Sequence, residues 1–237
     1  MNKALNILAT VVVLLGACRV KKEEANQTQA GEEQKVPKDM DAKELPQVTA
    51  LQDEATRDYM VSTEEVEPGY YLLESKSKKI RMLFPEEGKN VALLSSYSKN
   101  EESIGFDEYD REANILMNGQ INYYYGQSFL QKTDTMLEII SGKNSYSGEY
   151  QSENTDDTEM YLGYKKSTFE NLDSKYNYSY RYFGFVKPNQ SENEGVEYSF
   201  IFTCKDDKQS CSLEDKDVRD TVKKMITSIQ FMSNIED

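Results

Sequence analysis

Two cysteines near the C-terminal end could form a covalent bond or a reactive pair. Cys204 and Cys211 are separated by six polar residues, 205–210. A redox pair would have the closer C-x-x-C spacing, and two thiolates without histidine leave a zinc site incomplete. In an exported chain, a pair at this spacing is typical of a structural disulfide. We therefore expect a Cys204–Cys211 bond.

Four tyrosines at alternate positions form the candidate binding site. Tyr176, Tyr178, Tyr180 and Tyr182 fall on one face of a predicted strand, because side chains alternate between the two faces. An exposed row would suit a glycan or a protein partner, since tyrosine joins an apolar ring to a polar tip. Burial of the row under a helix is the preferred alternative, because the aromatic residues on a sheet face usually pack against another element.

Carboxylates gather in three clusters, and a pair of carboxylates can hydrolyse a glycoside. The clusters cover residues 107–110, 153–159 and 206–207. None has the spacing and central glycine of a calcium loop, and we expect solvated surface. Histidine and tryptophan are absent, which excludes Ser-His-Asp and Cys-His catalysis. The sequence predicts no catalytic residue, no metal and no cofactor.

Cys18 follows a short apolar segment and is the candidate site of lipid attachment. Residues 1–17 carry one cation, Lys3, then an apolar run, and end on Gly16-Ala17, which is typical of a secretory signal too short to span a bilayer. Leu15-Gly16-Ala17-Cys18 resembles the lipobox of bacterial lipoproteins. That resemblance implies a Cys18 carrying two acyl chains such as palmitate, and a protein anchored at the outer face of the cell membrane. A plain secreted protein is the alternative.

Composition divides the rest of the chain at Tyr59. Residues 18–58 contain no aromatic residue and many charges, so we expect a disordered tether. All 17 tyrosines and all nine phenylalanines lie in residues 59–237, the expected single domain. With 28 basic and 42 acidic side chains the net charge is −14, which disfavours nucleic acid as a partner.

Hydrophobic spacing in residues 59–237 predicts an α+β fold. A hairpin is expected over 70–74 and 80–84, and further strands over 91–97, 103–109, 115–125, 159–165, 176–186 and 196–204. Short connections favour antiparallel pairing. A 3.6-residue period predicts one helix over 129–140, ending at Gly142, and a second over 218–229. The expected architecture is a mostly antiparallel sheet packed with these two helices.

This layout resembles the photosystem-P-like and Mog1-like α/β/α sandwich, most specifically where the last helix runs into Ser228-Ile229-Gln230-Phe231. Residues 37–41, 45–48, 67–75, 82–85 and 176–180 also resemble the YvcA group of lipoproteins from Bacillus-type bacteria. The resemblance implies a surface lipoprotein associated with complex colony architecture in biofilms, and no catalytic residue.

Three functional classes follow from these features. The first is a non-enzymatic, lipid-anchored protein that interacts with an envelope or matrix protein or polysaccharide. The alternatives are an envelope receptor for a small ligand or glycan and, less favoured, a hydrolase that uses carboxylates.

Overall fold

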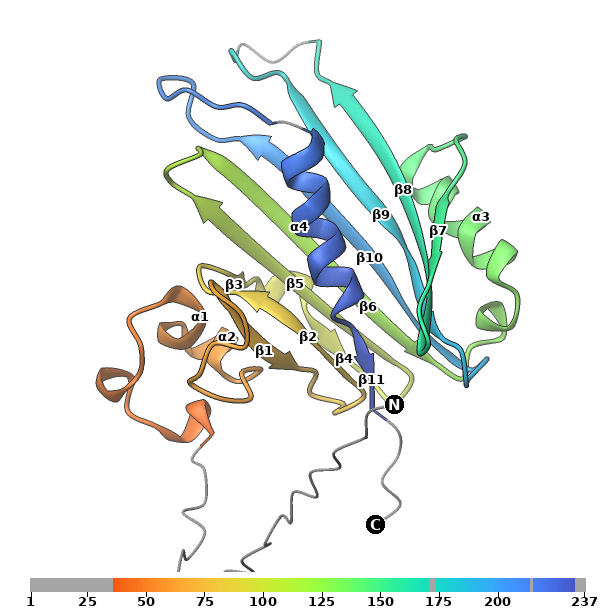
Figure 1. Ribbon diagram of the computed structural model, residues 1–237, viewed down its shortest axis with the longest axis horizontal. Coiled ribbons are helices and arrows are strands. Elements are labelled where there is room, and N and C mark those ends of the chain that lie inside the picture. The colour runs from red at the N-terminus through yellow and green to blue at the C-terminus, as the bar shows by residue number, and fades with distance from the viewer. Residues whose placement is uncertain (1–35, 171–173, 214, 233–237) are drawn as a thin grey trace, which may run out of the picture. The chain divides into compact units, whose positions relative to one another are not determined.

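Two antiparallel sheets organise the chain. The computed structural model describes residues 36–170, 174–213 and 215–232 (Figure 1). The strands of the larger sheet are β3 (Lys89–Asn90), β4 (Ser96–Tyr97), β5 (Glu101–Asp110), β6 (Ile115–Tyr125), β7 (Gln151–Asn154), β8 (Thr158–Thr168), β9 (Tyr178–Pro188) and β10 (Glu194–Cys204). Their order is β3-β5-β6-β10-β9-β8-β7, with β4 also paired to β5. The strand expected over 91–97 is instead a 3-10 turn, η3 (Ala92–Leu94), between two short strands.

The smaller sheet joins the two ends of the folded chain. It contains β1 (Tyr70–Glu74), β2 (Ile80–Pro85) and β11 (Gln230–Phe231), in the order β1-β2-β11. The expected opening hairpin is confirmed, with Leu72 opposite Leu83. The Ser228 hydroxyl accepts a 2.8 Å hydrogen bond from the Leu83 amide, just before β11 pairs with β2. The C-terminal segment is thus held against the first hairpin.

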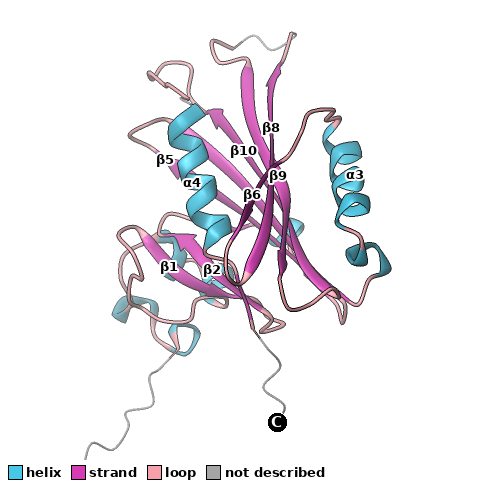
Figure 2. Ribbon diagram, turned by 45° about the vertical axis from the view of Figure 1, so that its right-hand side comes forward, coloured by secondary structure: helices cyan, strands magenta, loops and turns pink. Residues whose placement is uncertain are grey.

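Helices cover both faces of the larger sheet. Figure 2 shows α3 (Thr133–Asn144), preceded by the 3-10 turn η4 (Ser128–Gln131), on one face and α4 (Asp215–Thr227) on the other. Helix α3 continues through Gly142, so the stop expected there is wrong. It ends where Ser145 takes a left-handed conformation (φ 46°) and its amide reaches back to Gly142 and Ser141. The mostly antiparallel α+β class is confirmed.

Each face of the larger sheet has its own core. On the α4 face, alternate residues of β5, β6, β9 and β10 pack with the apolar stripe of α4 and with the smaller sheet. This core includes Phe106, Met117, Tyr182, Tyr198, Phe200, Val222, Met225 and Ile226. On the α3 face, a smaller core combines Tyr124, Phe183 and Phe185 with Met136 and Ile140. Strand β9 is therefore buried on both faces, because Tyr182 and Phe183 point to opposite sides.

The folded chain begins earlier than the sequence predicts. Residues 37–57 form η1 (Pro37–Asp39), η2 (Ala42–Glu44), α1 (Thr49–Gln52) and α2 (Glu54–Arg57). The expectation of a disordered tether is therefore wrong for residues 36–58. The expected signal peptide, residues 1–17, and residues 18–35 lie outside the described part of the chain. The expected domain boundary at residue 59 moves to about residue 36.

A few apolar residues and polar bonds hold this N-terminal segment. Leu45, Ala50 and Leu51 are at most 3% exposed and join the larger core. The Thr56 hydroxyl accepts a 2.7 Å hydrogen bond from the Asn90 amide, which links α2 to β3. The Asp53 side chain caps α2 by accepting from the Thr56 amide at 3.0 Å. The segment orders without aromatic residues because Leu45, Ala50 and Leu51 are buried against the rest of the fold.

Replacing Leu51 tests whether this segment belongs to the cooperative fold. Leu51→Ala removes a fully buried side chain, and we expect it to lower the free energy of unfolding by about 2–5 kcal/mol. Lys43→Ala, at an exposed position of the same segment, is the matched control and should change it by less than about 0.5 kcal/mol. Urea denaturation followed by circular dichroism measures both. Equal stability of the two variants would show that residues 36–58 contribute nothing to the fold.

Candidate functional site

The predicted tyrosine row is divided by the structure. Tyr182 is completely buried in the core under α4, and Tyr176 precedes β9 and is only 9% exposed. The Tyr176 hydroxyl donates a 2.8 Å hydrogen bond to the Gln209 carbonyl. Both residues are therefore structural, and their assignment as partner-binding residues is wrong. The preferred interpretation, burial under a helix, holds for Tyr182, whereas Tyr176 is bonded to the loop between Cys204 and Cys211.

Tyr178 and Tyr180 remain partly exposed and have a cation beside them. The Lys166 ammonium, on β8, lies 4.7 Å from the Tyr178 ring centroid and 5.2 Å from that of Tyr180. The Tyr164 ring stacks on Tyr180 at 5.8 Å, with 20° between the planes. We call Tyr164, Lys166, Tyr178 and Tyr180 the tyrosine–lysine patch. Aromatic rings with polar tips beside one cation suit a sugar ring or an acidic, aromatic protein surface.

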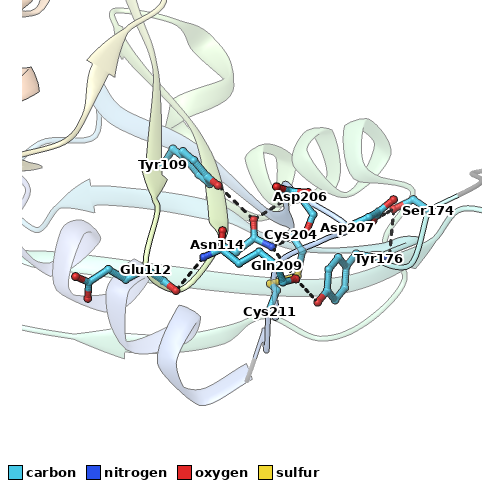
Figure 3. Close-up of a disulfide and its surroundings, with 10 residues drawn as sticks. All are labelled: Tyr109, Glu112, Asn114, Ser174, Tyr176, Cys204, Asp206, Asp207, Gln209 and Cys211. Atoms are coloured by element: carbon cyan, nitrogen blue, oxygen red, sulfur yellow. Dashed lines mark hydrogen bonds between the residues drawn. A yellow bond between two sulfur atoms is a disulfide. The ribbon is translucent and has the colours of Figure 1, made fainter.

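The predicted disulfide is present close to this patch. Cys204 ends β10, Cys211 precedes α4, and their sulfurs are bonded, with 6.0 Å between the Cα atoms. Figure 3 shows the loop that they close packed against Tyr109, Asn114 and Tyr176. The bond therefore holds the connection from the central strand β10 to α4.

Asn114 anchors the disulfide loop to the β5–β6 turn. It is buried, and its φ of 58° is a left-handed conformation that asparagine tolerates better than most residues. Its side-chain amide donates to the Asp206 carbonyl at 2.8 Å, and its oxygen accepts from the Asp206 amide at 2.9 Å (Figure 3). Gln209 adds a 2.6 Å bond to the Arg111 carbonyl. The sequence pattern does not reveal Asn114, because the loop that it anchors lies more than ninety residues away.

A row of amide side chains on β6 forms a second polar surface. Asn118, Gln120 and Asn122 lie on the same sheet face as Phe183 and α3, and all three are partly exposed. The Asn122 oxygen accepts hydrogen bonds from the Ser103 hydroxyl at 2.8 Å and from Gln120 at 3.1 Å. We call Ser103, Asn118, Gln120 and Asn122 the amide row. Its signal in the sequence is the strict alternation of these amides with Met117, Gly119, Ile121 and Tyr123.

Comparison with known proteins shows which family this chain belongs to. A family model described as "Putative lipoprotein YvcA" matches residues 46–230. The chain belongs to the YvcA lipoprotein family. The protein named "Putative lipoprotein YvcA" from Bacillus subtilis (strain 168) is 50% identical over 224 residues, covering 94% of this chain and 93% of that protein. The resemblance to the YvcA group is confirmed.

Two solved structures resemble the YvcA-family fold at low identity. The Ran-binding protein Mog1p of Saccharomyces cerevisiae gives a TM-score of 0.40 at 9% identity, over 68% of this chain and 95% of that chain. A Mog1 point mutant gives 0.38 at 9% identity, over 70% and 97%. These two structures resemble this chain in fold alone.

The acidic clusters of this YvcA-family chain mostly form local bonds. Asp110 accepts from the amides of Glu112 and Ala113 at 2.9 Å, and Glu159 pairs with Lys187 at 3.2 Å. Within residues 36–170, 174–213 and 215–232, no group of three or more potential ligands could hold a metal ion. No helix of that part is long and apolar enough to cross a bilayer.

Glu108 differs from the other acids of the chain. It lines a cleft of about 370 Å³ between β5, β6, β1 and α4. Burial, reinforced by Asp110, Glu87 and Glu86, raises the pKa of Glu108 to about 7. Burial and the nearby Glu108 also raise the pKa of Tyr70 to about 12. Sequence analysis grouped Glu108 with the solvated surface, because the strand pattern alone does not show which polar residue points inward.

Removing the disulfide should weaken the YvcA-family fold without abolishing it. Closing this loop constrains the unfolded chain, so we expect a Cys204→Ser/Cys211→Ser double variant to lose about 2–3 kcal/mol of unfolding free energy. Denaturation with and without reductant measures the change. Reductant should lower the stability of the wild type and leave the double variant unaffected. Alkylation of both cysteines in the folded, unreduced protein would contradict the bond.

The raised pKa of Glu108 predicts a pH dependence of stability. The carboxyl titrates near 4.5 in the unfolded chain and at about 7 in the fold, so the folded state holds the extra proton between these values. Stability from this group is therefore present at low pH and lost as the pH rises through 7. We expect Glu108→Gln to be more stable than the wild type at pH 8 and nearly equal to it at pH 4. Thermal denaturation between pH 4 and pH 8 measures the difference in stability between this variant and the wild type. Glu112→Gln, at an exposed position, is the control. The same difference at pH 4 and at pH 8 would contradict the raised pKa.

Proposed function

We propose that this chain is a lipoprotein anchored by acylated Cys18 at the outer face of the cell membrane. Its folded part then acts by binding an envelope or matrix partner, without turnover. The Leu15-Gly16-Ala17-Cys18 sequence and the name of the Bacillus subtilis relative support the anchor. The resemblance to the YvcA group suggests that the partner belongs to the matrix of structured colonies.

The observation that carries the binding role is the tyrosine–lysine patch. Its aromatic rings are partly exposed at one end of the larger sheet, although the sheet buries most of its other aromatic residues. The disulfide and Asn114 fix the neighbouring loops, so the surface is held rigid before binding. Pre-ordering lowers the entropic cost of association.

The patch also lies far from the point at which the described chain begins. The described chain enters through η1 at the end of the molecule that holds the smaller sheet (Figure 1). The patch and the disulfide loop lie where β8 ends and β9 begins, at the opposite end of the strands. The patch therefore lies at the end of the folded part that is remote from residue 36.

A glycan receptor is the second candidate, and the amide row favours it. Side-chain amides carry both donors and acceptors, which match the hydroxyl groups of a sugar. Three of them are aligned on the flat, partly exposed face of β6.

Variants of the anchor and the patch test the proposal in cells. We expect Cys18→Ser to release the protein from the membrane fraction, and mass spectrometry of the wild type to find acylated Cys18. Lys166→Glu and Tyr178→Ala/Tyr180→Ala should abolish both complex colony architecture and the crosslinked product formed on intact cells. Lys166→Glu changes an exposed side chain, so its loss of function is not a folding defect.

Two control variants separate binding at the patch from the alternatives. Tyr97→Ala, on β4 and 60% exposed, removes an aromatic ring outside the patch and should leave the phenotype unchanged. Gln120→Ala should matter only if the amide row binds a glycan. An Asp107→Asn or Asp157→Asn variant that abolishes the phenotype, with folding, abundance and crosslinking unchanged, would overturn the proposal in favour of catalysis.

A further inference from the structure

The cleft beside Glu108 combines an apolar floor with an acidic rim. Ile115, Met117, Phe202 and Val218 line it, and the last three are less than 5% exposed to solvent. Its volume of about 370 Å³ is that of a small-molecule site. Glu108, Asp110 and Asp217 also line the cleft, and none of the described residues that line it is basic. The cleft therefore offers an apolar surface and negative charge at the same place.

Glu108 has no partner in the described part of the chain. Other inward-facing acids are satisfied: Glu102 accepts from the amides of Lys76 and Ser77, and Glu197 pairs with Lys143 at 2.7 Å. No such bond reaches Glu108 from the side chains of residues 36–170, 174–213 or 217–232. A partly buried carboxylate without a partner loses hydration and gains nothing in return. A bound cation would supply the missing partner.

Nearby charges make the cleft more negative. Asp110 faces Glu108 from its own strand, Glu86 and Glu87 from the segment after β2, and Asp217 from α4. Tyr70 faces it from β1. Lys224 of α4 lies with its ammonium 4.2 Å from the Tyr70 ring centroid and is paired with Glu67 at 2.8 Å. That ammonium is therefore already engaged outside the cleft.

We propose that this cleft binds a small aliphatic amine, with its alkyl chain on the apolar floor and its ammonium group at Glu108. An anion would be repelled by the four neighbouring acids, and a neutral apolar ligand would leave Glu108 unpaired. A metal ion would leave the apolar floor unused. An alkylammonium ion matches both halves of the site, and the ion pair forms where water is partly excluded, which strengthens it.

Binding should depend on the ionisation of Glu108. The pKa of this carboxyl is raised to about 7 in the free protein, whereas an alkylamine stays protonated well above that pH. The carboxylate form that pairs with the ammonium therefore predominates only at pH values above about 7. Affinity should rise between pH 6 and pH 8.

A matched pair of ligands tests the proposal directly. Hexylamine and 1-hexanol share an alkyl chain and differ in charge, and nuclear magnetic resonance of labelled Met117 and Val218 methyl groups reports binding in the cleft. At pH 8 we expect hexylamine to bind at least tenfold more tightly than hexanol. Glu108→Gln should weaken hexylamine about tenfold to a hundredfold and leave hexanol unchanged. Glu112→Gln, outside the cleft, should affect neither.

Three outcomes would overturn the proposal. These are equal affinity for hexylamine and hexanol, an unchanged affinity of Glu108→Gln for hexylamine, and hexylamine binding that does not weaken between pH 8 and pH 6. Tighter binding of a blocked lysine peptide, such as acetyl-Gly-Lys-Gly-amide, would assign the cleft to a protein side chain and overturn the small-molecule assignment. The cleft is separate from the tyrosine–lysine patch, so these results leave the proposed anchoring and partner binding untouched.

Discussion

The fold depends on a central sheet that is apolar on both faces. In β9, consecutive residues Tyr182 and Phe183 are fully buried on opposite sides. Neither face can be left to water, because each buried aromatic side chain contributes several kilocalories per mole to folding only when it is covered. Helix α3 covers part of one face. The other face is larger and needs α4, the smaller sheet and the N-terminal segment together.

That requirement explains which parts of the fold sequence patterns could predict. The first hairpin, the long strands and α4 all show periodic apolar residues, and they were predicted within a few residues. The segment 36–58 was missed because its burial depends on a surface supplied elsewhere. Ala50 and Leu51 lie in a charged stretch of sequence, yet both are completely buried, and the Ala50 amide donates a 2.9 Å hydrogen bond to the Glu86 carbonyl just after β2. Local composition cannot predict burial that depends on residues far away in the sequence.

The candidate sites follow the same logic. The disulfide was predictable because two cysteines in an exported chain have few alternatives. The binding prediction is wrong for Tyr176 and Tyr182 and stays a prediction for Tyr178 and Tyr180, because alternation gives the face of a residue and not its depth along the strand. Tyr182 lies in the middle of β9, under α4, whereas Tyr178 and Tyr180 lie at its beginning. Glu108 and Asn114 were invisible for a related reason: their character comes from residues on other strands and loops.

The early start of the folded chain limits how far the domain can stand from a membrane. If Cys18 carries the lipid, the folded part beginning at residue 36 leaves 18 residues, 18–35, to bridge the gap. Even at full extension such a segment spans about 60 Å. The folded part could then reach only as far from the membrane as this segment and its own length allow. A target deeper in the surrounding matrix would lie out of reach. A protein anchored through Cys18 could therefore engage only material that is laid down close to the lipid surface.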